Sequence, residues 1–322
     1  MDESILAALQ ARLTHAMPQL EGLPDSVWKR TAALNTWGTN AIEGNTLTHD
    51  DVERLLVEDA TVPGRPVPDV LETLGHEEAF RSLLVRRKNP IDLVSILELH
   101  ETVFRAAPRK RPGQWRVSNV YIAGTSFRPP RRDEVVPLVE AWCIEVAKRL
   151  RAKSSPLGNA AWMHHRFEQI HPFEDGNGRA GRLLMNLFLV KAGWPPLHIL
   201  PPDRAGYIRA LEEANGGDLV PLEHLLRTCM ARGILDLLDQ IGAPHDELRD
   251  IKEFAGKAWV PHKADYLALR CRQGVIPGIR SGETSGPVKP KAGRPRWLTS
   301  EVALRLVLES DAATRPSGAS RA

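Results

Sequence analysis

The stretch 171-HPFEDGNGRAGR-182 places a histidine, acidic residues, glycines and two arginines within twelve residues. It lies between two segments with helical periodicity, 156–170 and 178–192. Gly176 and Gly178 permit left-handed backbone angles before the second helix, and successive amides in such a turn form a concave anion site. The helix N-terminus adds partial positive charge and unpaired N–H groups. The stretch therefore predicts an anion-binding turn between two helices.

The charged side chains of this stretch suit a phosphate-bearing ligand. Arg179 and Arg182 are three residues apart and so share one face of the helix, where guanidinium groups bind phosphate oxygens in forked pairs. Asp175 is a hard oxygen ligand suited to Mg²⁺, and His171 can act as a general base. Singly, these residues are typical of an ordinary polar loop. Together they supply a base, a metal ligand and paired cations, so we favour the chemical interpretation.

Composition excludes several classes of protein. The chain has 322 residues, of which 42% are hydrophobic and 26% charged, as expected for a globular protein of two or three folding units. The net charge of +3 is too small to indicate nucleic-acid binding by itself. The cysteines are far apart, which argues against a disulfide framework or a zinc site. This pattern is typical of a protein in a reducing cytoplasm. We expect neither a signal peptide nor a membrane span.

Periodicity predicts a mainly α-helical fold. One segment differs, because 115-WRVSNVYIAGTSF-127 alternates and is rich in β-formers, which predicts a β-hairpin. Beyond residue 245, we expect two short helices over 247–255 and 262–273, a stretch rich in glycine, proline and basic residues over 276–297, and a last helix over 299–309. The remaining helices are predicted over residues 2–16, 25–44, 48–60, 70–87, 90–106, 133–152, 202–215 and 219–240.

The opening stretch resembles the signature of the Fic family, His-x-Phe-x-(Asp/Glu)-Gly-Asn-Gly-Arg-x-x-Arg, at every specified position. The resemblance implies a Fic-type helical bundle that transfers AMP from ATP to a Tyr, Thr or Ser hydroxyl of a target protein, and to itself. His171 would deprotonate the hydroxyl, Asp175 would hold Mg²⁺, with Mn²⁺ as an alternative metal, and Phe173 would anchor the loop. The implied phosphate-binding residues are Gly176, Asn177, Gly178, Arg179 and Arg182.

Two further segments carry the resemblance. The hairpin within 113–124 is similar to the Fic flap, whose edge pairs with an extended target segment by strand addition. The implied docking residues are Val120, Tyr121 and Ile122, and the alternative is an ordinary hairpin packed on the bundle. Residues 203–226 resemble the segment that closes the adenine pocket, with Tyr207 and Asn215 at the nucleoside-facing positions. Ile208 replaces a common aromatic residue there, which leaves the nucleotide preference open.

The stretch 39-TNAIEGN-45 has two interpretations. It is typical of the polar end of a helix with Gly44 as its cap. It also resembles the inhibitory motif of the family, (Ser/Thr)-x-x-x-Glu-(Gly/Asn), matched by Thr39, Glu43 and Gly44. The resemblance implies that Glu43 pairs with Arg182 and displaces the γ-phosphate of ATP. In some relatives the same glutamate orients a water that removes AMP, so a de-AMPylase or a transferase of another nucleotide stays an alternative.

The C-terminal region resembles an excisionase-type winged helix-turn-helix appended to some bacterial Fic proteins, over 263–280 and 294–308. The resemblance predicts DNA binding, and with it a second function class, a DNA-binding regulator whose Fic domain is a sensor. The alternative is a basic linker and a packing helix. Dimerisation is common among relatives. We expect an N-terminal helical region (1–106, with the inhibitory helix over 25–44), a catalytic core (107–242), a winged region (245–310) and a disordered tail (311–322).

The predicted phosphate contacts of this C-terminal region are basic side chains spread along it. They are Arg270, Arg272, Arg280, Lys289, Lys291, Arg294 and Arg296.

Overall fold

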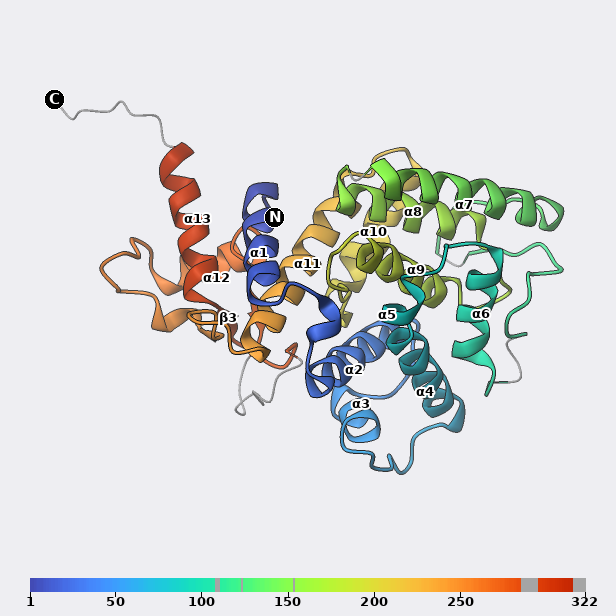
Figure 1. Cartoon of the computed structure of the whole chain (residues 1–322), viewed down its shortest axis with the longest axis horizontal. Helices are drawn as coiled ribbons and strands as arrows, with labels where there is room; N and C mark the ends of the chain where they lie inside the picture. The colour runs from blue at the N-terminus through green and yellow to red at the C-terminus, as the bar shows by residue number, and fades with distance from the viewer. Residues whose placement is uncertain (108–110, 123, 153, 285–294, 315–322) are drawn as a thin grey trace. The chain divides into compact units, whose positions relative to one another are not determined.

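The computed structural model describes residues 1–107, 111–122, 124–152, 154–284 and 295–314, and it is mainly α-helical (Figure 1). Two compact units are present. One spans Pro24–Leu226, and the other combines Met1–Leu23 with the chain from Arg227 onward. Within the described residues, no helix is both long and apolar enough to cross a membrane.

The unit Pro24–Leu226 is built around α9, Asn177–Lys191, whose residues from Arg179 to Val190 are all buried. A helix that is buried on all sides forms the centre of a bundle. Helices α8 and α9 lie side by side, and α2, α4, α5 and α6 also contact α9 (Figure 1). The helices of this unit are α2 (Asp25–Ile42), α3 (His49–Leu56), α4 (Val67–Arg81), α5 (Leu83–Arg86), α6 (Leu93–Phe104), α7 (Val135–Ala152), α8 (Pro156–Ile170), α9, α10 (Arg204–Asn215) and the start of α11 (Val220–Gln240).

The helices predicted within this unit are confirmed, with a few shifts. Helix α4 begins three residues earlier than predicted, because proline is tolerated in the first turn of a helix and Pro68 lies there. The segment predicted as one helix over 70–87 forms α4 and α5, which are separated at Ser82. Helix α3 ends at Leu56, four residues before the predicted end.

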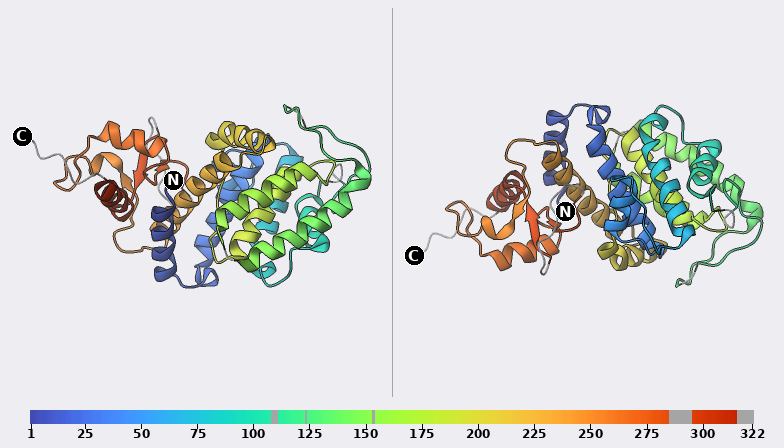
Figure 2. Two further views of the ribbon diagram at one scale, coloured as in Figure 1. Left: turned by 90° about the horizontal axis from the view of Figure 1, so that it is seen from above. Right: turned by 90° about the horizontal axis from the view of Figure 1, so that it is seen from below.

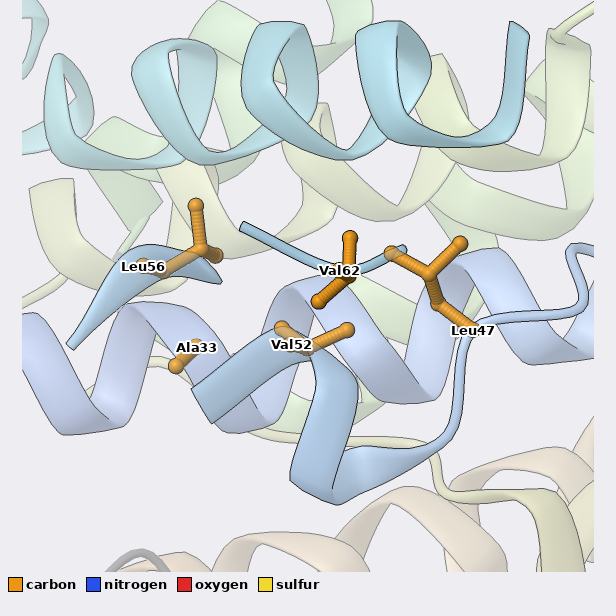
Figure 3. Close-up of a cluster of buried hydrophobic side chains, with 5 residues drawn as sticks. All are labelled: Ala33, Leu47, Val52, Leu56 and Val62. Carbon is orange, nitrogen blue, oxygen red and sulfur yellow. The ribbon is translucent and has the colours of Figure 1, made fainter. Parts of the chain in front are cut away.

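A small hydrophobic cluster fixes the chain just after α2. Val52 and Leu56 of α3, together with Leu47, pack against Ala33 of α2 and against Val62 (Figure 3). Each of these side chains is at most 9% exposed. Burying them removes apolar surface from water at ~25 cal/mol per Å². The cluster therefore anchors both flanks of the turn that carries the end of α2.

The predicted β-hairpin over 115–127 is wrong. No strand is assigned among the described residues from 111 to 134, and Figure 2 draws this green segment without strand arrows. The Arg116 guanidinium donates hydrogen bonds to the carbonyl groups of Ser118 and Pro130, one on each leg of the segment. Side-chain bonds therefore close the segment where a strand ladder was expected. We call residues 111–122 and 124–134 the flap segment.

The other unit combines the first helix of the chain with its C-terminal part. It contains α1 (Glu3–Ala16), the rest of α11, α12 (Ala264–Arg272) and α13 (Glu301–Thr314). Strands β1 (Arg249–Asp250), β3 (Trp297–Thr299) and β2 (Ile279–Arg280) form an antiparallel sheet in that order, with Leu298 opposite both Asp250 and Ile279. The orange strands lie among the orange and red helices in both views of Figure 2.

Two expectations for this unit need correction or restriction. The helix expected over 247–255 is instead β1 followed by a 3₁₀ turn, Ile251–Glu253, since the Asp250 side chain accepts a hydrogen bond from the Lys252 N–H and caps that turn. The last helix continues to Thr314, so residues 311–314 of the predicted tail are helical. The rest of the tail, 315–322, and the basic stretch 285–294 lie outside the described residues.

Candidate active site

The turn between α8 and α9 has the predicted left-handed backbone at Gly176 but not at Gly178, which lies within α9. Gly176 is the N-cap of α9 with φ +81°, and His171 caps α8 with φ +50° and ψ 60°. The Asn177 side chain closes the turn, because its Oδ1 accepts from the Phe173 N–H at 2.8 Å and its Nδ2 donates to the Phe173 carbonyl at 2.9 Å. Phe173 is fully buried. Asn177 thus holds the turn in shape, and its predicted contact with phosphate stays a prediction.

Side chains of neighbouring helices lie close to both glycines of the turn. A Cβ on Gly176 would overlap the Phe104 ring, and a Cβ on Gly178 would overlap a carboxylate oxygen of Glu43. The carboxylate of Glu43 therefore lies against the N-terminal turn of α9, where unpaired N–H groups and the helix dipole favour negative charge. This is the position where the sequence predicted a bound anion.

Arg182 is paired with Glu43 inside the bundle. Its Nη2 donates to Glu43 Oε1 at 2.6 Å, and its Nε donates to the Thr39 hydroxyl at 2.6 Å. The Arg182 side chain is 5% exposed and that of Glu43 is 34% exposed. Burial opposes ionisation of Glu43, but Arg182 more than offsets it and holds the pKa of Glu43 below its ordinary value. The predicted contact between these residues is therefore present, with Thr39 as part of it.

Arg179 is paired with Glu72 of α4, which was not predicted as a site residue. The two side chains are 4% and 10% exposed. The Arg179 guanidinium lies over the Phe104 ring, 4.5 Å from its centre, and 3.9 Å from Asp175 Oδ1. Each signature arginine thus has one carboxylate partner from an N-terminal helix. Nothing in the sequence around Glu72 distinguishes it from other helical glutamates.

His171 is suited to accept a proton at neutral pH. Its Nδ1 lies 3.2 Å from the Glu168 carbonyl, which can only accept, so Nδ1 carries the hydrogen and Nε2 has the lone pair. Burial, together with the charge of Arg116, lowers the pKa of His171 although Glu43 and Asp175 act in the opposite direction. The imidazole is therefore neutral at pH 7.

Comparison with known proteins identifies this arrangement. Residues 90–189 match the family model described as Fic/DOC family. The chain contains a Fic/DOC family domain. Protein adenylyltransferase Fic of Nematostella vectensis is 33% identical over 199 residues, which cover 61% of this chain and 46% of that protein. The chain spans less than half the length of the curated relatives it matches.

Solved structures carry the same fold as this Fic/DOC domain and its neighbouring helices. Fic-1 from Caenorhabditis elegans superposes with a TM-score of 0.62 at 27% identity, over 75% of this chain and 72% of that chain. A Fic domain containing signaling protein from Bacteroides thetaiotaomicron gives a TM-score of 0.68 at 23% identity, over 76% and 98%. At that identity the likeness concerns the fold alone.

A pocket of about 800 Å³ opens beside the Fic signature turn, with Glu43, Glu72, Asp175 and Arg179 in its lining. The Asp175 side chain is 48% exposed. Across the described part of the chain, no cluster of three or more His, Cys, Asp or Glu residues could hold a metal alone. One carboxylate beside the predicted phosphate site fits Mg²⁺, which takes one or two carboxylates plus substrate phosphates.

The predicted nucleoside residues of the Fic domain have protein partners. Tyr207 is 2% exposed, and its hydroxyl lies 2.7 Å from His164 Nε2 and 3.3 Å from Arg182 Nη1. Asn215 Oδ1 accepts a hydrogen bond from His165 Nε2 at 2.9 Å. Ile208 is 46% exposed. Tyr207 therefore supports Arg182 in this structure, and nucleoside binding by Tyr207 and Asn215 stays a prediction.

The predicted docking residues lie on the flap segment. Tyr121 is 75% exposed, and Arg128 lies 5.2 Å from the centre of its ring. Val120 and Ile122 are half-buried. Their role in docking a target stays a prediction.

His100 of α6 was also not predicted as a site residue. Its Nε2 lies 3.0 Å from the Asp175 carbonyl, and its Nδ1 accepts from the Gly113 N–H at 3.1 Å. Its ring stacks on Phe173 at 3.7 Å between centres. Burial lowers the pKa of His100 to about 4, so the ring is neutral and can donate on one side while it accepts on the other.

Proposed function

We propose that this chain is a protein adenylyltransferase that transfers AMP from Mg·ATP to a hydroxyl side chain of a target protein and is held inactive by Glu43. Curated relatives at about one third identity are named protein adenylyltransferase Fic. The observation that carries the proposal is the position of Glu43. Its carboxylate lies against the anion-binding turn and pairs with Arg182, the arginine proposed to bind the γ-phosphate.

The reaction requires an oxygen nucleophile, a held triphosphate and a neutralised leaving group. His171 Nε2 takes the hydroxyl proton as the target oxygen forms a bond to the α-phosphorus and the bond to pyrophosphate breaks. The amides at the start of α9 stabilise the charge on the α-phosphate, and Arg179 and Arg182 neutralise the departing pyrophosphate. Asp175 would hold Mg²⁺, or Mn²⁺ in its place, which when bound supplies positive charge to the phosphates.

Inhibition follows from competition for one cation. Arg182 cannot bind Glu43 and the γ-phosphate through the same N–H group, because its Nη2 already donates to Glu43. ATP that binds while Arg182 is still paired with Glu43 would have its α-phosphate out of line with the target oxygen. Misplacement by about 1 Å can reduce the rate ~10²-fold.

Intact-mass spectrometry tests the proposal. The Glu43→Gly variant is incubated with Mg²⁺ and separately with ATP, UTP, GTP or CTP, and we expect a mass gain equal to AMP with ATP. The gain should be absent in Glu43→Gly/His171→Ala. Glu58→Gly, which removes an exposed glutamate after α3, is the matched control and should behave as wild type. No gain with any nucleotide contradicts the proposal, and a gain with another nucleotide supports the alternative transferase.

The opposite reaction is an alternative for the same site. A water held by Glu43 would then remove AMP from a modified protein. Loss of label from self-modified Glu43→Gly protein, mixed with wild-type chain and without ATP, would favour this direction. No loss would favour transfer.

DNA binding by the C-terminal unit stays a prediction. Several of its arginines are paired within the unit, since Arg270 lies 2.9 Å from Asp311 and Arg296 lies 3.0 Å from Asp250. Such pairs reduce the positive charge that phosphate contacts require. Retention on a nucleic-acid column at moderate salt, lost on removal of residues 245–322, would support DNA binding. A homodimer and a cytoplasmic location also stay predictions.

A further inference from the structure

Arg116 is a buried arginine in the flap segment that the proposed reaction does not use. It is 3% exposed, and its guanidinium donates to three backbone carbonyls. Nε donates to His171 at 2.9 Å, Nη1 donates to Ser118 at 2.9 Å, and Nη2 donates to Pro130. A guanidinium is planar and rigid, so these three acceptors are fixed relative to one another.

The three acceptors belong to two functional parts of the molecule. Ser118 and Pro130 lie on the outgoing and returning legs of the flap segment, and His171 is the proposed base. The backbone N–H of Arg116 donates to the Pro172 carbonyl at 2.9 Å as well. One residue thus joins both legs of the flap segment to the backbone of the base.

Stacked rings reinforce the same junction. Trp115 stacks on Phe173 with 5.3 Å between ring centres, and Phe173 stacks on His100 at 3.7 Å. A Trp–Phe pair at the separation of Trp115 and Phe173 contributes ~0.5–1.5 kcal/mol beyond burial. The start of the flap segment is therefore attached to the signature turn by Trp115 as well as by Arg116.

The backbone of His171 needs such support. A non-glycine residue in the left-handed region is strained by ~1–3 kcal/mol and persists only when its surroundings hold it there. His171 has φ +50°. Its carbonyl also belongs to the end of α8, where helix carbonyls lack intrahelical partners. Arg116 supplies the partner for that carbonyl.

We propose that Arg116 is a positioning residue that holds the backbone of His171 at a fixed position relative to both legs of the flap segment. A target hydroxyl carried by the flap segment then lies at a fixed distance from the His171 imidazole. The role rests on the proposed function, because it assumes that the flap segment carries the target. Lys cannot reproduce these bonds, because its three donors share one nitrogen, whereas the guanidinium spreads its donors over three nitrogens in a rigid plane. A neutral side chain lacks both the charge and this geometry.

The charge of Arg116 gives a readout that a merely structural role would not move. The charged groups that act on the His171 pKa are Arg116 from the flap segment, Glu43 from the end of α2 and Asp175 from the signature turn. Arg116 lowers the pKa and the two acids raise it. A lysine keeps this charge while it loses the forked geometry, and a methionine loses both.

The experiment compares Arg116→Lys and Arg116→Met in the Glu43→Gly protein, with Arg131→Met as the matched control. Arg131 lies on the same segment with a 76% exposed side chain. We expect kcat of AMP transfer to fall about 10- to 100-fold in both Arg116 variants, while KM for ATP changes less than about threefold. The His171 pKa, followed by NMR of its ring Cε1–H, should rise in Arg116→Met and stay near the parent value in Arg116→Lys.

Several outcomes would overturn the proposal. Full kcat in Arg116→Lys would show that the three-carbonyl geometry is not needed. An unchanged His171 pKa in Arg116→Met would show that the guanidinium does not lie near the base in solution. Equal loss of kcat and ATP binding in both variants, together with a lower Tm, would show a general structural role. If the Glu43→Gly parent transfers nothing, the proposed function fails, and the NMR measurement still decides the placement of Arg116.

Discussion

Replacing Glu43 by glutamine tests the competition for Arg182 with little change in shape. A hydrogen bond between charged groups contributes ~1.5–3 kcal/mol. Because the Glu43 side chain is 34% exposed, water competes with Arg182 for its carboxylate. We therefore expect Glu43→Gln to weaken the interaction with Arg182 by only about 1–2 kcal/mol. Arg182 keeps acceptors in the variant, since its Nε donates to the Thr39 hydroxyl and its Nη1 to the Tyr207 hydroxyl. The bundle should therefore stay folded.

The same energy predicts the change in nucleotide affinity. If ATP must displace Glu43 before Arg182 can hold the γ-phosphate, the variant avoids that cost. A difference of 1–2 kcal/mol corresponds to a ~5- to 30-fold lower Kd. Calorimetric titration with a non-hydrolysable ATP analogue and Mg²⁺ measures this ratio. In thermal unfolding, the analogue should raise the Tm of Glu43→Gln more than that of wild type.

A double-mutant cycle decides whether Arg182 is the shared partner. The effect of Glu43→Gln on Kd should disappear in the Arg182→Met background, because the guanidinium for which Glu43 and the γ-phosphate compete is then absent. Arg182→Met alone should weaken binding of the analogue. An equal Kd for wild type and Glu43→Gln, or an unchanged effect in the Arg182→Met background, would refute the competition.

Three other measurements test separate parts of the structure. Gly176→Ala should lower the free energy of unfolding, measured with denaturant, by ~2 kcal/mol or more, because the left-handed backbone and the clash with Phe104 add together. Gly193 has the same φ of +81° but open space around it, so Gly193→Ala should cost only the ~1–2 kcal/mol of the left-handed backbone. Equal losses in the two variants would exclude the clash with Phe104. The rate of AMP transfer by Glu43→Gly should rise with pH along a limb centred below 6.5, because the base must be neutral and burial lowers the His171 pKa; a midpoint above 7 would contradict this assignment. Arg12→Ala should speed amide hydrogen exchange in α13, because it leaves the fully buried Asp246 carboxylate, which accepts from Ser300 directly before α13, without its arginine. Unchanged exchange would show that the Arg12–Asp246 pair does not hold the unit together.

The helices and the signature turn were predictable from the sequence for a local reason. Apolar spacing encodes a buried helix face, and Gly176 encodes a left-handed backbone directly before a helix. The contact of Glu43 with Arg182, although 139 residues apart, was predicted from the resemblance of a short motif. The hairpin was predicted wrongly because alternation describes an extended chain equally well with or without a paired strand.

Glu72, His100 and Arg116 could not be predicted, for reasons that lie in their partners. His100 and Arg116 bind backbone carbonyls, and a carbonyl leaves no trace in the residue that provides it. Glu72 binds a side chain more than a hundred residues away, from a helix whose other surface glutamates look the same in sequence. Their importance comes from burial, which only the folded chain reveals.

Burial also separates the two carboxylates that hold the signature arginines. Glu72 is 10% exposed and its arginine lies over Phe104, so releasing it would leave a buried charge without a partner at a cost of several kcal/mol. Glu43 is 34% exposed at the end of α2, and its carboxylate can move into water when a phosphate replaces it. We therefore expect the Arg179 pair to stay closed when the predicted phosphate ligand binds. We expect the Arg182 pair to be the contact that a nucleotide, or a signal acting on the end of α2, opens.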